Sequence, residues 1–156
     1  MTTLRFTLSA PPPSVNSSTK PTGGGSQLTI INGQFAINRK AAGKRNSKDY
    51  KAWIKLAGQE LMTQRGKLPA LCYWRIDIGI PRALTKADIG NLEKAIPDLL
   101  VDHRRVPDDR YCVDTRTRFI AGDKVLIDVE KCDLENWLQI MRPGKDLEKR
   151  LRAADA

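Results

Sequence analysis

The sequence contains few of the residues that build disulfides, zinc sites and membrane spans. Its three cysteines, Cys72, Cys112 and Cys132, include no Cys-x-x-Cys pair, so neither a disulfide framework nor a zinc site is indicated. No apolar run approaches the roughly 20 residues that cross a bilayer, and the first residues lack the basic-then-apolar pattern of a secretory signal. We therefore expect a protein of the reducing cytoplasm with no membrane partner.

Histidine occurs once, as His103. A histidine can serve as a general base near neutral pH, but the charged neighbours Asp102, Arg104 and Arg105 predict a solvated or DNA-facing loop instead. The glycine-rich stretch TGGGS at 22–26 has no Lys-Ser/Thr after it and does not lead from a strand into a helix, which argues against a phosphate-binding loop. No small-molecule cofactor is expected.

Basic residues are abundant. Lysine and arginine total 27 against 18 acids, which gives a formal net charge of +9 and an isoelectric point near 9.7. At 156 residues the chain is long enough for one domain with its own core. A charge excess of this size on a small domain predicts a polyanionic partner, with nucleic acid the first candidate.

The order of expected elements predicts an α/β protein, a single-domain mixed β-sheet with helices packed on it. The expected elements are a strand at 4–8, a hairpin at 27–38, a helix at 47–64, a central strand at 72–80, a helix at 88–100, a second hairpin of 111–120 with 124–132, and a short helix at 133–141. Residues 14–27 are expected to be a mobile loop, 39–46 a basic loop and 142–156 a charged tail after a domain of residues 1–141.

The helix at 47–64 has two distinct faces. Its apolar positions lie three and four residues apart, the spacing of one helix face: Tyr50, Trp53, Ile54, Ala57 and Leu61. Lysines follow the same spacing on another face, at Lys48, Lys51 and Lys55. Together with Lys44 and Arg45, these lysines are candidates for phosphate contacts, and a role in solubility is the alternative.

The stretch KADIGNLEKAIPDLL at 86–100 combines an apolar side with a compact polar side. With Asp88 as the N-cap, the helical period places Asn91, Lys94 and Asp98 together. Pro97 would lie inside this helix and bend its last turn. The polar side is either an ordinary solvated face with an exposed Lys94–Asp98 pair or half of a metal site.

The stretch VPDDRYCVD, just downstream, favours the metal site. It supplies three acids between the helix and the next strand, Asp108, Asp109 and Asp114, and a loop there can bring a carboxylate back toward the start of the preceding helix. Hard cations such as Mg²⁺ bind one or two carboxylates together with water and substrate phosphate. Acids beside a lysine in a basic protein are what metal-assisted phosphodiester cleavage requires.

The motif DIGNLEKAIPDLL…PDDRYCVD resembles the RusA family of endodeoxyribonucleases, which are Holliday-junction resolvases. The family pattern is an Asp-x-Asp-Asn-x-x-Lys helix, an Asp four residues after the lysine, and an Asp-Asp pair beyond a short connection. The matching residues are Asp88, Asn91, Lys94, Asp98, Asp108 and Asp109. The strand before PPPSVN also fits, with Asn16 as the asparagine after the prolines, so that the resemblance covers residues 3–132.

The resemblance implies a bacterial or phage-encoded homodimer that nicks four-way DNA junctions symmetrically with Mg²⁺ or Mn²⁺. By position, it assigns catalysis to Asp88, Lys94 and Asp109, and it makes Asp98 and Asp108 additional candidate metal ligands beside Asp88 and Asp109. The residues expected to contact DNA are Asn16, Lys44, Arg45, Lys48, Lys51, Asn91, Arg104 and Arg105.

The sequence departs from the family pattern at Gly90, which occupies the position of the third family acid. Glycine offers no side chain to a metal. Asp98, Asp108 or Asn91 could supply the missing donor in a working nuclease; alternatively, the protein binds branched DNA and cuts it poorly. A third hypothesis is a nucleic-acid-binding regulator without catalytic ancestry.

Overall fold

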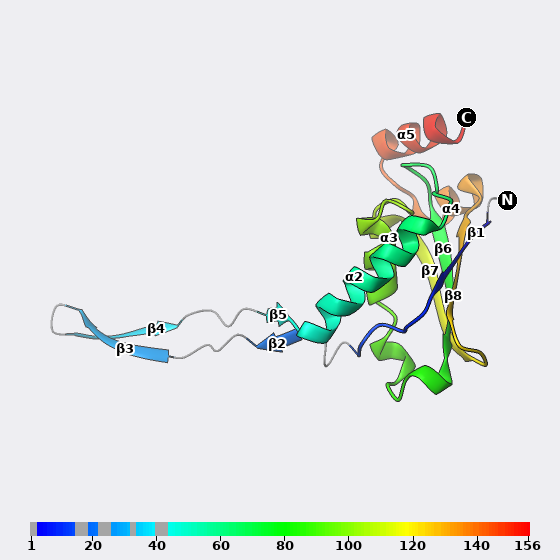
Figure 1. The fold of residues 1–156 in the computed structure, drawn as a ribbon. Coiled ribbons are helices and arrows are strands. Elements are labelled where there is room, and N and C mark those ends of the chain that lie inside the picture. Colours follow the sequence, from blue (N-terminus) through cyan, green and yellow to red (C-terminus); the bar gives the residue numbers. More distant parts are fainter. Residues whose placement is uncertain (1–2, 15–18, 22–25, 32–33, 40–43) are drawn as a thin grey trace.

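The central sheet has four strands in the order β1-β8-β6-β7 (Figure 1). The computed structural model describes residues 3–14, 19–21, 26–31, 34–39 and 44–156. In spatial order, the strands are β1 (Thr3–Leu8), β8 (Val125–Lys131), β6 (Trp74–Pro81) and β7 (Cys112–Ile120). β8 is antiparallel to both neighbours, whereas β6 and β7 are parallel. The predicted mixed sheet is confirmed, and the predicted central strand supplies β6, which has a partner on each side.

Two helices, α2 (Lys48–Thr63) and α3 (Ala95–Asp102), pack on the apolar face of this sheet (Figure 1). Alternate residues along β6 point to that face, and they share one buried core with both helices. This core includes Phe6, Trp53, Ala57, Leu61, Trp74, Ile76, Ile78, Ile96, Leu99, Leu100 and Ile127. Ser47 begins α2 as predicted, because its hydroxyl accepts a hydrogen bond of 3.1 Å from the Tyr50 N–H.

The opposite face of the sheet carries charged side chains. Arg118 pairs with Asp77 at 2.7 Å across β7 and β6, and Arg116 pairs with Asp114 at 3.1 Å. Asp114, which follows the Asp-Asp pair in sequence, therefore lies on this face rather than beside α3. Exposed pairs of this kind contribute about 0–1 kcal/mol each, so they keep the face polar more than they stabilise the fold.

The predicted hairpin of 111–120 with 124–132 is wrong. Both segments form strands, β7 and β8, but β6 lies between them, parallel to β7 and antiparallel to β8. Because β6 and β7 are parallel, the chain between them must cross from one end of the sheet to the other. That crossover contains every acid of the candidate site.

The crossover contains three short 3-10 turns and one α-helix. The turns are η1 (Arg82–Leu84), η2 (Ile89–Asn91) and η3 (Asp109–Tyr111). The predicted single helix at 88–100 is therefore divided into η2 and α3. Pro97 lies in the first turn of α3, where its missing N–H needs no partner within the helix. The expected bend in the last turn is thus replaced by an ordinary helix start.

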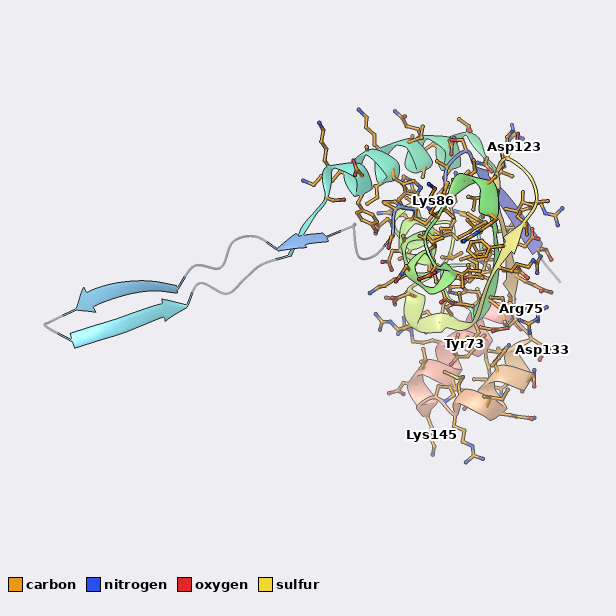
Figure 2. All side chains as sticks on the ribbon, turned by 90° about the horizontal axis from the view of Figure 1, so that it is seen from below. Tyr73, Arg75, Lys86, Asp123, Asp133 and Lys145 are labelled. Carbon is orange, nitrogen blue, oxygen red and sulfur yellow. The ribbon has the colours of Figure 1, made fainter. Side chains whose placement is uncertain are left out.

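A second, smaller core lies where α4 (Leu134–Met141) and α5 (Lys145–Asp155) meet the start of β6. Tyr73 is buried there together with Leu134, Leu138 and Leu151, and Figure 2 shows Tyr73 and Asp133 near these helices. The predicted helix at 133–141 is confirmed, with Asp133 accepting a hydrogen bond of 2.9 Å from the Asn136 N–H. The segment 142–156, expected as a charged tail, contains helix α5.

Between β1 and α2, the described residues form four more strands. β3 (Ser26–Ile31) and β4 (Gln34–Arg39) pair as the predicted hairpin. β2 (Thr19–Pro21) pairs with β5 (Lys44–Asn46), within the segments expected as the loop 14–27 and the basic loop 39–46. Those two segments thus contain strands, and Figure 1 shows β3 and β4 extending away from the central sheet.

Candidate functional site

The first part of the candidate site is the turn η2. Asp88 precedes it with extended backbone (φ −70°, ψ 148°), and the Asp88 carbonyl accepts a hydrogen bond of 3.0 Å from the Asn91 N–H. Gly90 is exposed, and a Cβ added to it would meet nothing within 4 Å. The position of the third family acid therefore has room for a side chain.

The second part is the start of α3. Lys94 is exposed and occupies the N-cap position, and Asp98 follows one turn later, half-buried. Leu92, Ala95, Ile96 and Leu99 are buried beneath this turn. The apolar periodicity predicted from the sequence is thus correct for these residues, and it holds Lys94 and Asp98 at the rim of the core.

The third part is η3, which the core anchors through Trp74. The Trp74 indole N–H donates to the Asp108 carbonyl at 3.4 Å. The Asp108 carboxylate caps the turn, accepting hydrogen bonds from the Arg110 N–H at 3.1 Å and from the Arg110 guanidinium at 2.7 Å. These bonds hold the pKa of Asp108 well below its usual range. Asp108 thus has a structural role here, whereas Asp109 beside it is exposed.

The crossover brings the two halves of the sequence motif together, because η3 lies against α3. The clearest sign is the pKa of Asp98, which is raised by partial burial, lowered by Lys94 and raised by the negative charges of Asp109 and Asp102. The charges of Asp109 and Lys94 therefore both act on Asp98, although Asp98 and Asp109 lie eleven positions apart in sequence. Within the described part of the chain, the Asp88 side chain makes no hydrogen bond or ion pair with Asp98, Asp109 or Lys94.

Tyr50 is a neighbour of this group that sequence reasoning treated only as core. Burial raises the pKa of the Tyr50 phenol, and the charges of Asp98 and Asp102 raise it further. Its ring packs on Trp53 with the centroids 5.9 Å apart. The first turn of α2 therefore lies next to the acids of α3, a proximity that the helical periodicity of α2 could not reveal.

The three residues that follow α3 differ from one another in what surrounds their side chains. His103 packs its ring against α2 at Gly58, where an added Cβ would lie 2.6 Å from the His103 Nε2 atom; the expected solvated loop is replaced by a helix–helix contact. The Arg105 guanidinium donates to the carbonyls of Leu61 at 2.5 Å and Gly66 at 3.1 Å, so it closes the end of α2 rather than facing DNA. Arg104 is exposed.

Of the remaining residues that were expected to contact DNA, the structure describes all but one. Lys48, Lys51 and Lys55 are exposed on α2, as predicted. Asn91 is half-buried in η2. Lys44 and Arg45 belong to β5, and Asn16 lies outside the described residues.

The donors present match a hard cation. The described residues contain no group of three or more His, Cys, Asp or Glu side chains arranged to hold a metal ion. Mg²⁺, however, commonly binds one or two carboxylates and completes its shell with water and substrate phosphate. The carboxylates of Asp98 and Asp109, with Asp88 at the start of the same crossover, are oxygen donors of that type.

Comparison with known proteins adds no assignment, since no family model and no curated protein matches this chain. Within the part of the chain that the structure describes, no helix has the length and apolar character needed to cross a membrane.

Proposed function

We propose that this protein is a RusA-like, homodimeric endodeoxyribonuclease that resolves four-way DNA junctions with Mg²⁺ or Mn²⁺. The observation that supports the proposal is the contact of η3, which begins at Asp109, with α3, which carries Asp98. This contact joins two separate parts of the sequence motif at the rim of the core. The pattern of the resemblance supplies the reaction, and the net charge of +9 suits a phosphate-rich substrate.

The roles follow from the chemistry of each group. Asp88 and Asp109, with Asp98 as a further carboxylate, would hold the cation, which when bound would supply Lewis-acid stabilisation of the phosphoryl oxygens. Lys94 carries a positive charge on the exposed side of α3 and would hold a phosphate oxygen against that cation. Lys48 and Lys51, exposed at the start of α2 beside Tyr50, would bind the adjoining phosphates.

The test is nicking of a synthetic four-way junction in Mn²⁺. Asp88→Asn and Asp109→Asn should each reduce nicking by about 100-fold or more while junction binding in EDTA is retained, because each removes a donor without removing positive charge. Asp123→Asn, an exposed acid beyond β7, is the matched control and should change neither property. Undiminished nicking by both site variants would contradict the proposal.

Gly90 supports a second candidate, a junction-binding protein with an impaired nuclease site. Gly90→Asp distinguishes the two, because the added side chain has open space around it. If the missing acid limits the site, Gly90→Asp will increase nicking and Mn²⁺ affinity with little change in stability. Gly144→Asp, equally open but in the N-cap position of α5, adds the same charge elsewhere and should leave both unchanged.

A further inference from the structure

Hydrogen bonds from η1 hold the residue that precedes Asp88. The η1 turn is closed by the Thr85 N–H, which donates to the Arg82 carbonyl at 3.4 Å. Ala87 is held through both of its backbone groups: its N–H donates to the Thr85 hydroxyl at 3.1 Å, and its carbonyl accepts from the Arg82 guanidinium at 3.2 Å. Because Asp88 follows Ala87 directly, the Arg82 side chain reaches the point where the chain enters the candidate site.

The Arg82 guanidinium also lies on an aromatic ring. Its Cζ atom is 4.5 Å from the centroid of the Phe119 ring, close to the end of β7, and η2 contacts the same strand. Both side chains are exposed, Phe119 by 37%. The ring face attracts the cation and restricts a side chain that would otherwise adopt many rotamers. The guanidinium is therefore held in place at the surface before any ligand binds.

In the described part of the chain, no acid pairs with this guanidinium. Arg118, on the opposite face of the sheet, pairs with Asp77 at 2.7 Å. Neither Arg82 nor the exposed Lys86 forms an ion pair with a described residue. A guanidinium has five N–H donors, and the bond to Ala87 uses one of them. Two positive charges and most of the Arg82 donors are thus open to an anion from outside.

We propose that Arg82 and Lys86 form a phosphate-binding subsite for the DNA strand at the cutting site. A planar guanidinium can bind two phosphate oxygens through parallel N–H donors, and one that is already stacked loses little further freedom when it does so. The bond to Ala87 places this subsite next to Asp88, a proposed metal ligand. The subsite rests on the proposed function, which supplies DNA as the source of the phosphate.

The first test removes both charges. Arg82→Gln/Lys86→Gln is compared with Lys145→Gln/Arg150→Gln, which removes one exposed lysine and one exposed arginine from α5; Figure 2 shows Lys86 and Lys145 in well-separated parts of the molecule. Binding to a synthetic four-way junction is measured in EDTA across a range of salt concentrations. We expect the subsite variant to bind at least about fivefold more weakly and to lower the salt slope by up to about 1.8, at about 0.9 per phosphate contact. An equal change of slope in both variants, or none in either, would overturn the proposal.

The second test separates phosphate binding from a purely structural role of Arg82. Thr85→Val removes the other hydrogen bond to Ala87 but no charge, so it should leave the salt slope unchanged. Phe119→Leu removes the ring and keeps an apolar side chain. Junction binding should then weaken about two- to fivefold, the size of an exposed cation–π contact, and no further in an Arg82→Gln background. If Arg82→Gln and Thr85→Val reduce nicking alike while both keep wild-type binding and slope, Arg82 only positions Ala87 and the proposal is wrong.

The subsite and the nuclease can fail separately, because the binding tests are made without metal. A wild-type protein that does not nick DNA but shows the slope change in Arg82→Gln/Lys86→Gln retains the subsite and loses the nuclease. Nicking by the wild type, together with an unchanged slope in that variant, retains the nuclease and loses the subsite.

Discussion

Asp98 is the residue on which the account of the site depends. Its sequence position alone fits an exposed pair with Lys94, which would contribute only about 0.3–0.5 kcal/mol. Its partial burial next to Asp109 is unfavourable for a charged carboxylate unless a cation neutralises the group. A bound cation would neutralise this group, and the metal-site interpretation of the stretch stays a prediction beside the solvated-face interpretation.

The pKa of Asp98 can be measured by NMR titration. It should lie above the usual value of 3.8, fall in Asp109→Asn because a like charge is removed, and rise in Lys94→Gln. Because this pKa is higher in the folded state, the contribution of Asp98 to stability decreases as pH rises through the interval above 3.8, and Asp98→Asn should remove that contribution. An Asp98 pKa that responds to Asp123→Asn as much as to Asp109→Asn would contradict the arrangement.

Arg105 and Arg104 are adjacent in sequence and should differ in their effect on stability. Arg105→Gln loses hydrogen bonds from a charged donor to the carbonyls of Leu61 and Gly66, so we expect a loss of about 1.5–3 kcal/mol in the free energy of unfolding. Arg104→Gln should change it by less than about 0.5 kcal/mol. Urea denaturation measures both, and equal effects would show that Arg105 does not close the end of α2.

The sequence patterns predicted which residues of the site are buried better than they predicted which side chains lie in contact. The spacing of Leu92, Ala95 and Ile96 correctly indicated which side of the 86–100 segment is buried. Nothing in the pattern indicated that Asp108 would be held by Arg110 or that Tyr50 would lie near Asp98. The proximity of Tyr50 to Asp98 depends on how two separate helices meet, which a single sequence does not encode locally, whereas the Asp108–Arg110 bonds join residues two positions apart within one turn.

Among the elements, the contact of α2 with α3 offers the sharpest test. Gly58→Ala places a Cβ 2.6 Å from the ring of His103 and should destabilise the protein by about 1–3 kcal/mol. In a His103→Ala background the same change should instead stabilise it by up to about 1 kcal/mol, because alanine is the better helix former. Thermal unfolding of the four proteins gives the coupling. Additive effects would contradict the packing of His103 on Gly58.

The errors at the element scale have physical causes. β7 and β8 are β-prone and are separated by a turn, so the local sequence favours a hairpin. The position of β6 between them depends on contacts between residues far apart in the sequence. η2 and α3 were predicted as one helix because the apolar spacing of the sequence continues through both, although no residue of η2 is buried. In contrast, α2, α4 and the β3–β4 hairpin carry their own capping or turn signals, and they were predicted correctly.

In the whole molecule, the candidate acids and most of the net positive charge lie in different segments of the chain. The sheet and its two helices hold the acids of the crossover at the rim of the core, while most of the net positive charge belongs to the segment before α2. A homodimer with a two-fold axis would present two such sites to a four-way junction, which suits paired nicks.

The most direct measurement of the central claim is a nicking assay of the wild-type protein on a four-way junction with each strand end-labelled in turn. In Mn²⁺ we predict paired nicks at symmetry-related positions and none in EDTA or on a linear duplex of the same sequence. Tight junction binding without nicks in either Mg²⁺ or Mn²⁺ would contradict the nuclease assignment and favour a binding protein whose site is impaired at Gly90.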